Sequence, residues 1–171
     1  MRSALTIGRA VLGGYIAIHG AQKLFGAMDG PGLEAAGAGF HAMGLTPGRE
    51  FAALASGSEL VGGVLTATGV AEPLGPIMII GAMAVATAVH RKQGPMAAKG
   101  GYALPLTNVA FATVLLATGP GHLRLSPKLS KPLTVLVALG AATIAGASLA
   151  KLLTHRPPAP EAAEPPAAQG D

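Results

Sequence analysis

The sequence predicts an all-α integral membrane protein, a bundle of hydrophobic helices that cross a bilayer. Half of the 171 residues are apolar and 12% are charged, whereas roughly a quarter of the residues in an ordinary soluble domain are charged. The apolar residues form long blocks that leave little polar face for water. Basic residues stand singly at the ends of these blocks, as they do at the flanks of membrane helices.

Five blocks approach the roughly 20 residues that a membrane-spanning helix needs. They cover residues 4–25, 51–71, 74–90, 103–119 and 132–153. The first block is too long for a signal-peptide core and has no convincing cleavage site, so we interpret it as a retained helix. Only Ala71-Glu72-Pro73 separates the second block from the third, which predicts a tight antiparallel hairpin.

Two segments lie outside the blocks. Residues 26–49 place Phe40, Met43 and Leu45 on one side after a Gly-Pro-Gly sequence. This pattern is compatible with a short amphipathic helix along the membrane surface and with a plain loop. Residues 155–171 are rich in Pro, Ala and Glu, a composition that cannot bury a core, so we expect a disordered tail.

Small residues recur four positions apart within the blocks, a spacing that lets helix backbones approach closely in lipid. The pairs are Ala10 with Gly14, Ser58 with Gly62, and Ala142 with Gly146. They predict close helix contacts, although a general bias toward alanine would produce some of the same pattern.

Polar residues of the first two blocks fall in the same half of the bilayer. At about 1.5 Å of rise per residue, His19 lies about 9 Å inside the end of the first block, and Lys23 lies in its last turn. These two residues share a helix face. Glu59 lies about 12 Å inside the second block, which starts on that same side.

The third and fourth blocks add polar groups at this end. The third block ends there at His90, and the fourth begins there, with Tyr102 just outside it and Asn108 less than two turns inside. The six residues form a predicted polar cluster, a candidate ligand or partner site: His19, Lys23, Glu59, His90, Tyr102 and Asn108. Ionisable groups within spanning helices are costly and therefore point to function.

Each charged residue also has a structural interpretation. A carboxylate at the depth of Glu59 must be protonated, paired or facing water, and Lys23 or His19 is the available partner; such a pair can also serve only to set helix register. Lys23 and His90 are equally compatible with interfacial positions. Arg9, at the opposite end of the first block, either anchors in the headgroups as a snorkelling side chain or pairs with a group such as Glu72.

Several kinds of chemistry are excluded or disfavoured. The chain has no cysteine, which excludes thiolate catalysis, iron–sulfur ligation and cysteine-bound zinc. Basic residues interleaved with aromatic residues are missing, so no nucleic-acid binding is predicted. We predict no metal site, and haem held between His19 and His90 is disfavoured because aromatic residues are scarce.

The motifs resemble those of the DoxX family of small bacterial membrane proteins. Those that carry the resemblance are Gly8-Arg9, the run from His19 to Gly26, Glu59-Leu60-Val61-Gly62-Gly63, His90, Gly100-Gly101-Tyr102, Pro105-Leu106 and Gly119-Pro120-Gly121. The resemblance covers about residues 4–127. It implies a four-helix membrane domain over residues 1–127, with residues 128–154 as an additional transmembrane helix. The chain departs from the family at Ala103, where relatives commonly carry an acidic residue.

The resemblance implies an accessory subunit of a quinone-linked or oxidative-stress-related membrane oxidoreductase complex. Such a subunit is more compatible with a non-catalytic role than with a stand-alone enzyme, and it would contact a quinone and oxidoreductase partner proteins while holding no cofactor of its own. Two alternatives stay open on the same residues. One is a small-molecule or proton-coupled permease, and the other is a non-catalytic assembly factor that docks proteins through the fifth helix and the tail.

The expected location is the bacterial inner (plasma) membrane, which the chain would cross several times. One end of the bundle collects Arg2, Arg124, Lys128 and Lys131, and the other collects Arg49, Arg91, Lys92, Lys99, Lys151 and Arg156. By the positive-inside rule the end with the polar cluster is predicted to face the cytoplasm.

Overall fold

The computed structural model describes residues 2–122 and 125–154, and these parts of the chain are helical with no strand. The helices are α1 (Arg2–Phe25), α2 (Gly32–Ala42), α3 (Gly48–Thr68), α4 (Leu74–His90), α5 (Ala103–Thr118) and α6 (Lys131–Thr154). Short 3-10 turns are η1 (Ala27–Asp29), η2 (Arg91–Gln93) and η3 (Ala97–Lys99). The predicted all-α class is confirmed. The predicted disordered tail lies outside the described residues.

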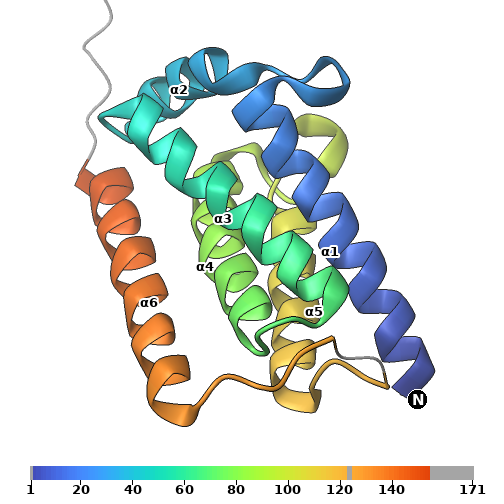
Figure 1. The fold of residues 1–171 in the computed structure, drawn as a ribbon. Coiled ribbons are helices and arrows are strands. Elements are labelled where there is room, and N and C mark those ends of the chain that lie inside the picture. Colours follow the sequence, from blue (N-terminus) through green and yellow to red (C-terminus); the bar gives the residue numbers. More distant parts are fainter. Residues whose placement is uncertain (1, 123–124, 155–171) are drawn as a thin grey trace, which may run out of the picture.

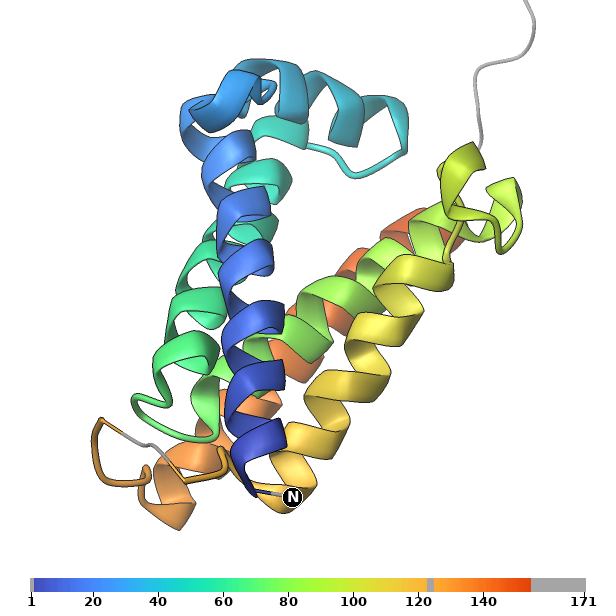
Figure 2. The same cartoon turned by 90° about the vertical axis from the view of Figure 1, so that its right-hand side faces the viewer.

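The helices form two pairs with one addition. α1 packs along α3, α4 packs along α5, and α6 packs against α4, while α2 crosses the end of the α1–α3 pair (Figure 1). The two pairs converge at the end that holds the N-terminus and diverge toward the end that holds α2 (Figure 2). A buried apolar core joins α1, α4 and α5; its members are Leu12, Ile16, Ile79, Met83, Ala112 and Leu115.

Hydrophobic length is consistent with a bilayer-spanning bundle. By length and composition, the segments Gly48–Thr68, Leu74–Gln93 and Lys131–Thr154 can cross a membrane, and Ala103–Thr118 is a shorter apolar helix. α1 has 24 residues, which is long enough to span, but Arg9, His19 and Lys23 make it less apolar. The protein is therefore a helical membrane protein, and each of the five predicted blocks is a helix.

The largest boundary difference concerns the second predicted block, residues 51–71, because α3 begins and ends three residues earlier. α3 ends where Gly69 takes the left-handed conformation, with φ of 68°. The Gly69 amide donates to the Leu65 carbonyl at 2.9 Å, which caps the helix in the manner typical of glycine. The α3–α4 hairpin is confirmed, since these helices are in contact.

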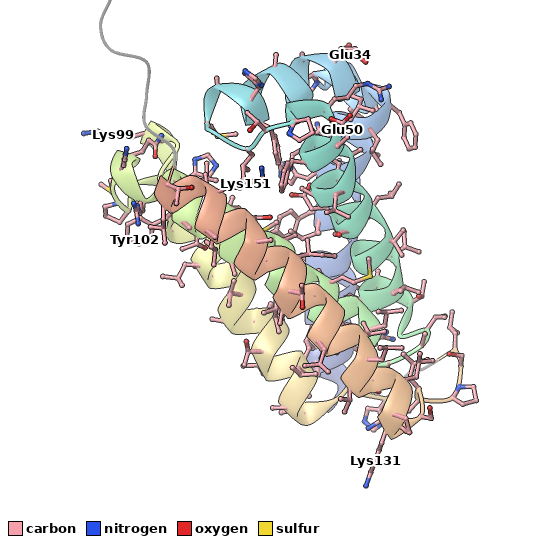
Figure 3. The ribbon with its side chains drawn as sticks, turned by 90° about the vertical axis from the view of Figure 1, so that its left-hand side faces the viewer. Glu34, Glu50, Lys99, Tyr102, Lys131 and Lys151 are labelled. Carbon is pink, nitrogen blue, oxygen red and sulfur yellow. The ribbon has the colours of Figure 1, made fainter. Side chains whose placement is uncertain are left out.

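Residues 26–49 contain a helix rather than a plain loop. α2 packs on α3, and Leu45 in the following connection is 1% exposed. Described members of the two predicted groups of basic residues lie at opposite ends of the bundle, whereas Arg124 and Arg156 fall outside the described residues. Lys99 and Lys151 lie at the α2 end, and Lys131 lies at the opposite end (Figure 3).

Candidate functional site

The crossing of α1 and α3 brings two helix backbones into direct contact. A Cβ atom added to Gly63 would lie 2.5 Å from the Ala17 amide nitrogen, and one added to Gly13 would lie 2.5 Å from the Gly63 carbonyl oxygen. A Cβ on Gly20 would lie 2.5 Å from the Leu60 amide nitrogen. Real Cβ atoms essentially never come closer than 3.0 Å. Glycine therefore sets the distance between the α1 and α3 backbones.

Lys23 and Glu59 form an ion pair between α1 and α3 beside this backbone contact. Lys23 Nζ lies 2.6 Å from Glu59 Oε1 and 2.6 Å from Oε2. The Glu59 side chain is 5% exposed and that of Lys23 is 28% exposed. A carboxylate buried this deeply needs a compensating charge. Lys23, and not His19, supplies it, so the Lys23 ammonium points into the protein.

Tyr15 and Asn108 connect α1 to α5 beside the ion pair. The Tyr15 hydroxyl donates a hydrogen bond to Asn108 Oδ1, and Asn108 Nδ2 donates to Met83 Sδ at 3.6 Å. The Tyr15 ring packs edge-on against His19, with ring centroids 5.8 Å apart. Tyr15 was missed in the sequence analysis. Its spacing could have indicated its role. Tyr15, His19 and Lys23 follow one another at intervals of four residues and therefore share a helix face.

A cavity of about 240 Å³ lies between the two helix pairs, and we call it the Lys23–Glu59 cavity. Its walls include five members of the predicted cluster: His19, Lys23 and Glu59 from the α1–α3 pair, and His90 and Asn108 from the α4–α5 pair. The two helix pairs that carry these residues diverge toward the α2 end (Figure 2). Its remaining walls are mostly apolar. The structure therefore brings together polar groups from four helices that are far apart in the sequence.

Tyr102 is the member of the predicted cluster that does not line this cavity. It precedes α5 and is half-buried, and it lies close to Lys99 at the tip of the α4–α5 pair (Figure 3). Its neighbours Gly100 and Gly101 do line the cavity. At this position the cavity wall is therefore formed by the glycine backbone and not by the tyrosine ring.

Arg9 lies at the opposite end, as its position in α1 predicts, but it is not a snorkelling side chain. It is 3% exposed, and its NH1 group donates to the Thr66 carbonyl at 3.1 Å. A Cβ on Gly69 would lie 2.3 Å from that guanidinium nitrogen. Glu72 is also buried at this end, at 3% exposure. The guanidinium is therefore held inside the protein, because the glycine cap of α3 leaves room for it.

Comparison of the sequence with known proteins identifies its family. No curated protein and no solved structure matches the chain. A family model described as DoxX matches residues 4–91, just over half of the chain. The match includes α1 to α4 and both partners of the ion pair, whereas the resemblance beyond residue 91 stays a prediction. The chain therefore belongs to the DoxX family.

Proposed function

We propose that the protein is an accessory subunit of a quinone-linked or oxidative-stress-related oxidoreductase complex in the bacterial inner membrane. In this proposal the Lys23–Glu59 cavity contacts a quinone headgroup. The observation that carries it is the buried ion pair in the wall of a cavity that also presents two histidines. Perturbed or paired ionisable groups in a cavity are typical of functional sites.

The residues of the cavity fit a quinone headgroup. A quinone supplies two carbonyl oxygens that accept hydrogen bonds and a ring that carries electrons to or from an oxidoreductase partner. The Lys23 ammonium can donate to such an oxygen, and Glu59 can accept from a hydroxyl. His19 and His90 add ring nitrogens that can donate or accept a hydrogen bond. The apolar walls exclude water from the ring.

The test measures quinone bound to the full chain. The protein is purified from native membranes in mild detergent, and co-purifying proteins and extracted quinone are quantified by mass spectrometry. Glu59→Gln should lower the quinone retained per chain at unchanged abundance. The matched control is Glu50→Gln, an exposed carboxylate on the same helix, which should retain as much quinone as the original chain. Equal amounts of quinone retained by the two variants would contradict the proposal.

Two other results would redirect the assignment. If Glu59→Gln lowered abundance alone, the ion pair would be structural, and an assembly factor would be the better description. A different observation favours a proton-coupled permease: buried charged residues lie at both ends of the bundle. Arg9 and Glu72 lie at one end and Glu59 lies toward the other, and the apolar core separates them. Proton uptake by proteoliposomes that contain the purified chain, lost in Glu59→Gln, would favour the permease.

A further inference from the structure

A second cavity separates α6 from α3. Its volume is about 370 Å³, and we call it the α6 cavity. It is lined by side chains of α3, α4 and α6 together with Phe40 and Leu45, and its walls are almost entirely apolar apart from Ser58 and Ser148. A cavity of this size and polarity is in the range that small-molecule ligands occupy.

The α6 cavity continues toward the α2 end of the bundle. On α4 its lining residues include Met78, Ala82 and Val85. The same helix then contributes Val89, and the η2 turn contributes Lys92, to a neighbouring cavity of about 390 Å³. On α6 the stripe that ends at Ser148 in the first cavity continues as Leu149 and Leu152 in the second. One apolar stripe therefore leads from the middle of the bundle to its end.

The end of this stripe is basic. Arg91 and Lys92 line the second cavity. Lys151 reaches from α6 to the Thr46 carbonyl, 2.8 Å away, and its ammonium lies 5.6 Å from the centre of the Phe51 ring, which lines the α6 cavity. Figure 3 shows Lys151 between the end of α6 and the region where α2 joins α3. In the described parts of the chain, no carboxylate lies within ion-pair distance of these three cations.

We infer that the α6 cavity and its basic end form a binding site for one anionic phospholipid. An acyl chain occupies the apolar cavity, and the phosphate lies among Arg91, Lys92 and Lys151. Uncompensated cations beside an apolar surface at the membrane boundary favour an amphiphile with a negative headgroup, and basic pockets between membrane helices bind anionic lipids. A purely apolar partner helix would add no counter-charge to these three cations, which have no ion-pair partner among the described residues.

This site is separate from the Lys23–Glu59 cavity, and α6 forms one wall of it. α6 lies outside the residues that match the family model, so lipid binding here would distinguish this chain from a member that ends after its fourth spanning helix. The lipid would also fill the space beside α6, where Gly81 of α4 and Ala141 of α6 approach no closer than ordinary van der Waals contact.

Native mass spectrometry of the full chain tests the inference. Phosphatidylglycerol and phosphatidylethanolamine with identical acyl chains are added to delipidated protein, and the bound lipids per chain are counted. We expect one phosphatidylglycerol per chain and weaker binding of phosphatidylethanolamine. The combined variant Arg91→Gln, Lys92→Gln and Lys151→Gln should lower phosphatidylglycerol affinity at least about tenfold, because basic side chains near the membrane surface attract anionic headgroups.

The matched control removes the same charge elsewhere. Lys99→Gln, Lys128→Gln and Lys131→Gln change three exposed lysines outside both cavities, and this variant should bind phosphatidylglycerol like the original chain. Ala145→Phe, which narrows the α6 cavity, should weaken both lipids equally. Glycerol phosphate without acyl chains should not compete. Equal affinity of the two triple variants, no preference between the lipids, or a protein recovered in place of lipid would each overturn the inference.

Discussion

The α1–α3 and α4–α6 interfaces both contain small residues, yet they pack in different ways. At the first, Gly13, Gly20 and Gly63 leave no room for a Cβ atom between the backbones. At the second, a Cβ on Gly81 would meet the Ala141 side chain at an ordinary 3.7 Å. A cavity remains beside α6. The tight interface positions an ion pair, whereas the loose one leaves space for a ligand.

This difference shows what small residues do in a membrane bundle. Without a hydrophobic driving force between helices in lipid, stability comes from close packing and interhelical hydrogen bonds. The α1–α3 pair uses both, through its glycines and the Lys23–Glu59 pair. α6 reaches the α2–α3 connection through an exposed hydrogen bond from Lys151 to the Thr46 carbonyl. Four substitutions test this contrast in order of expected effect.

The largest effect should follow Gly63→Ala. The new methyl would lie 2.5 Å from the Ala17 backbone nitrogen, so the helices must separate, and we expect the free energy of unfolding to fall by about 3 kcal/mol. Unfolding in mixed detergent micelles measures it. Gly14→Ala is the control, because a Cβ there meets nothing within 4 Å. Equal stability of the two variants would mean that α1 and α3 are not in backbone contact.

Removal of the ammonium from the tight interface should have the next largest effect. Lys23→Met leaves a buried carboxylate without its counter-charge, which we expect to cost roughly 2 kcal/mol of stability, less than for a fully buried pair because Lys23 is 28% exposed. The double variant Lys23→Met and Glu59→Gln should recover most of the loss. A double-mutant cycle measures this coupling, and a coupling energy near zero would contradict the paired arrangement.

At the α4–α6 interface, a glycine-to-alanine substitution should raise the stability of the protein rather than lower it. Gly81→Ala removes the entropic cost of glycine within a helix and adds an ordinary contact with Ala141, so we expect about 1 kcal/mol of added stability. The same unfolding measurement applies. The direct comparison is Gly63→Ala, the same chemical change made at the tight interface. A loss of stability in both variants would show that α4 and α6 approach more closely than the 3.7 Å contact indicates.

The smallest effect should follow Lys151→Met. This side chain is exposed and makes one backbone hydrogen bond and a contact with the Phe51 ring, so its removal should change stability by about 0.5 kcal/mol in lipid-free detergent. Lys131→Met, at the opposite end of α6, serves as the control and should change stability even less. A loss comparable to that of Lys23→Met would mean that α6 is held as firmly as α1.

Much of the fold was predictable because hydrophobic length and turn residues act locally. The five predicted blocks are all helices, and the short α3–α4 connection forms the expected hairpin. The spacing of small residues was less informative. Gly62 of the predicted pairs does pack against Met78 of α4, but Gly14 and Gly146 have open space around them. The backbone contact of α1 is made by Gly13 and Gly20, which the predicted pairs did not include.

The candidate site was predictable in outline, because depth follows from counting residues along a helix. His19, Glu59 and His90 were placed at one end, and they share a cavity wall. The position of Tyr102 away from the cavity and the hydrogen bond from Tyr15 to Asn108 were not predictable. Both depend on how the α4–α5 pair is rotated against α1, and side-chain spacing within one helix carries no information on that rotation.

The sequence by itself determined the class of protein, the helices and the end of the bundle that holds the polar residues, because these follow from hydrophobicity and from rise per residue. Only the tertiary structure decided which polar groups meet. It paired Glu59 with Lys23 rather than His19, buried Arg9 against the Thr66 carbonyl, and left a cavity beside α6. These outcomes depend on distances between helices, which close backbone packing sets at glycine positions that no single helix reveals.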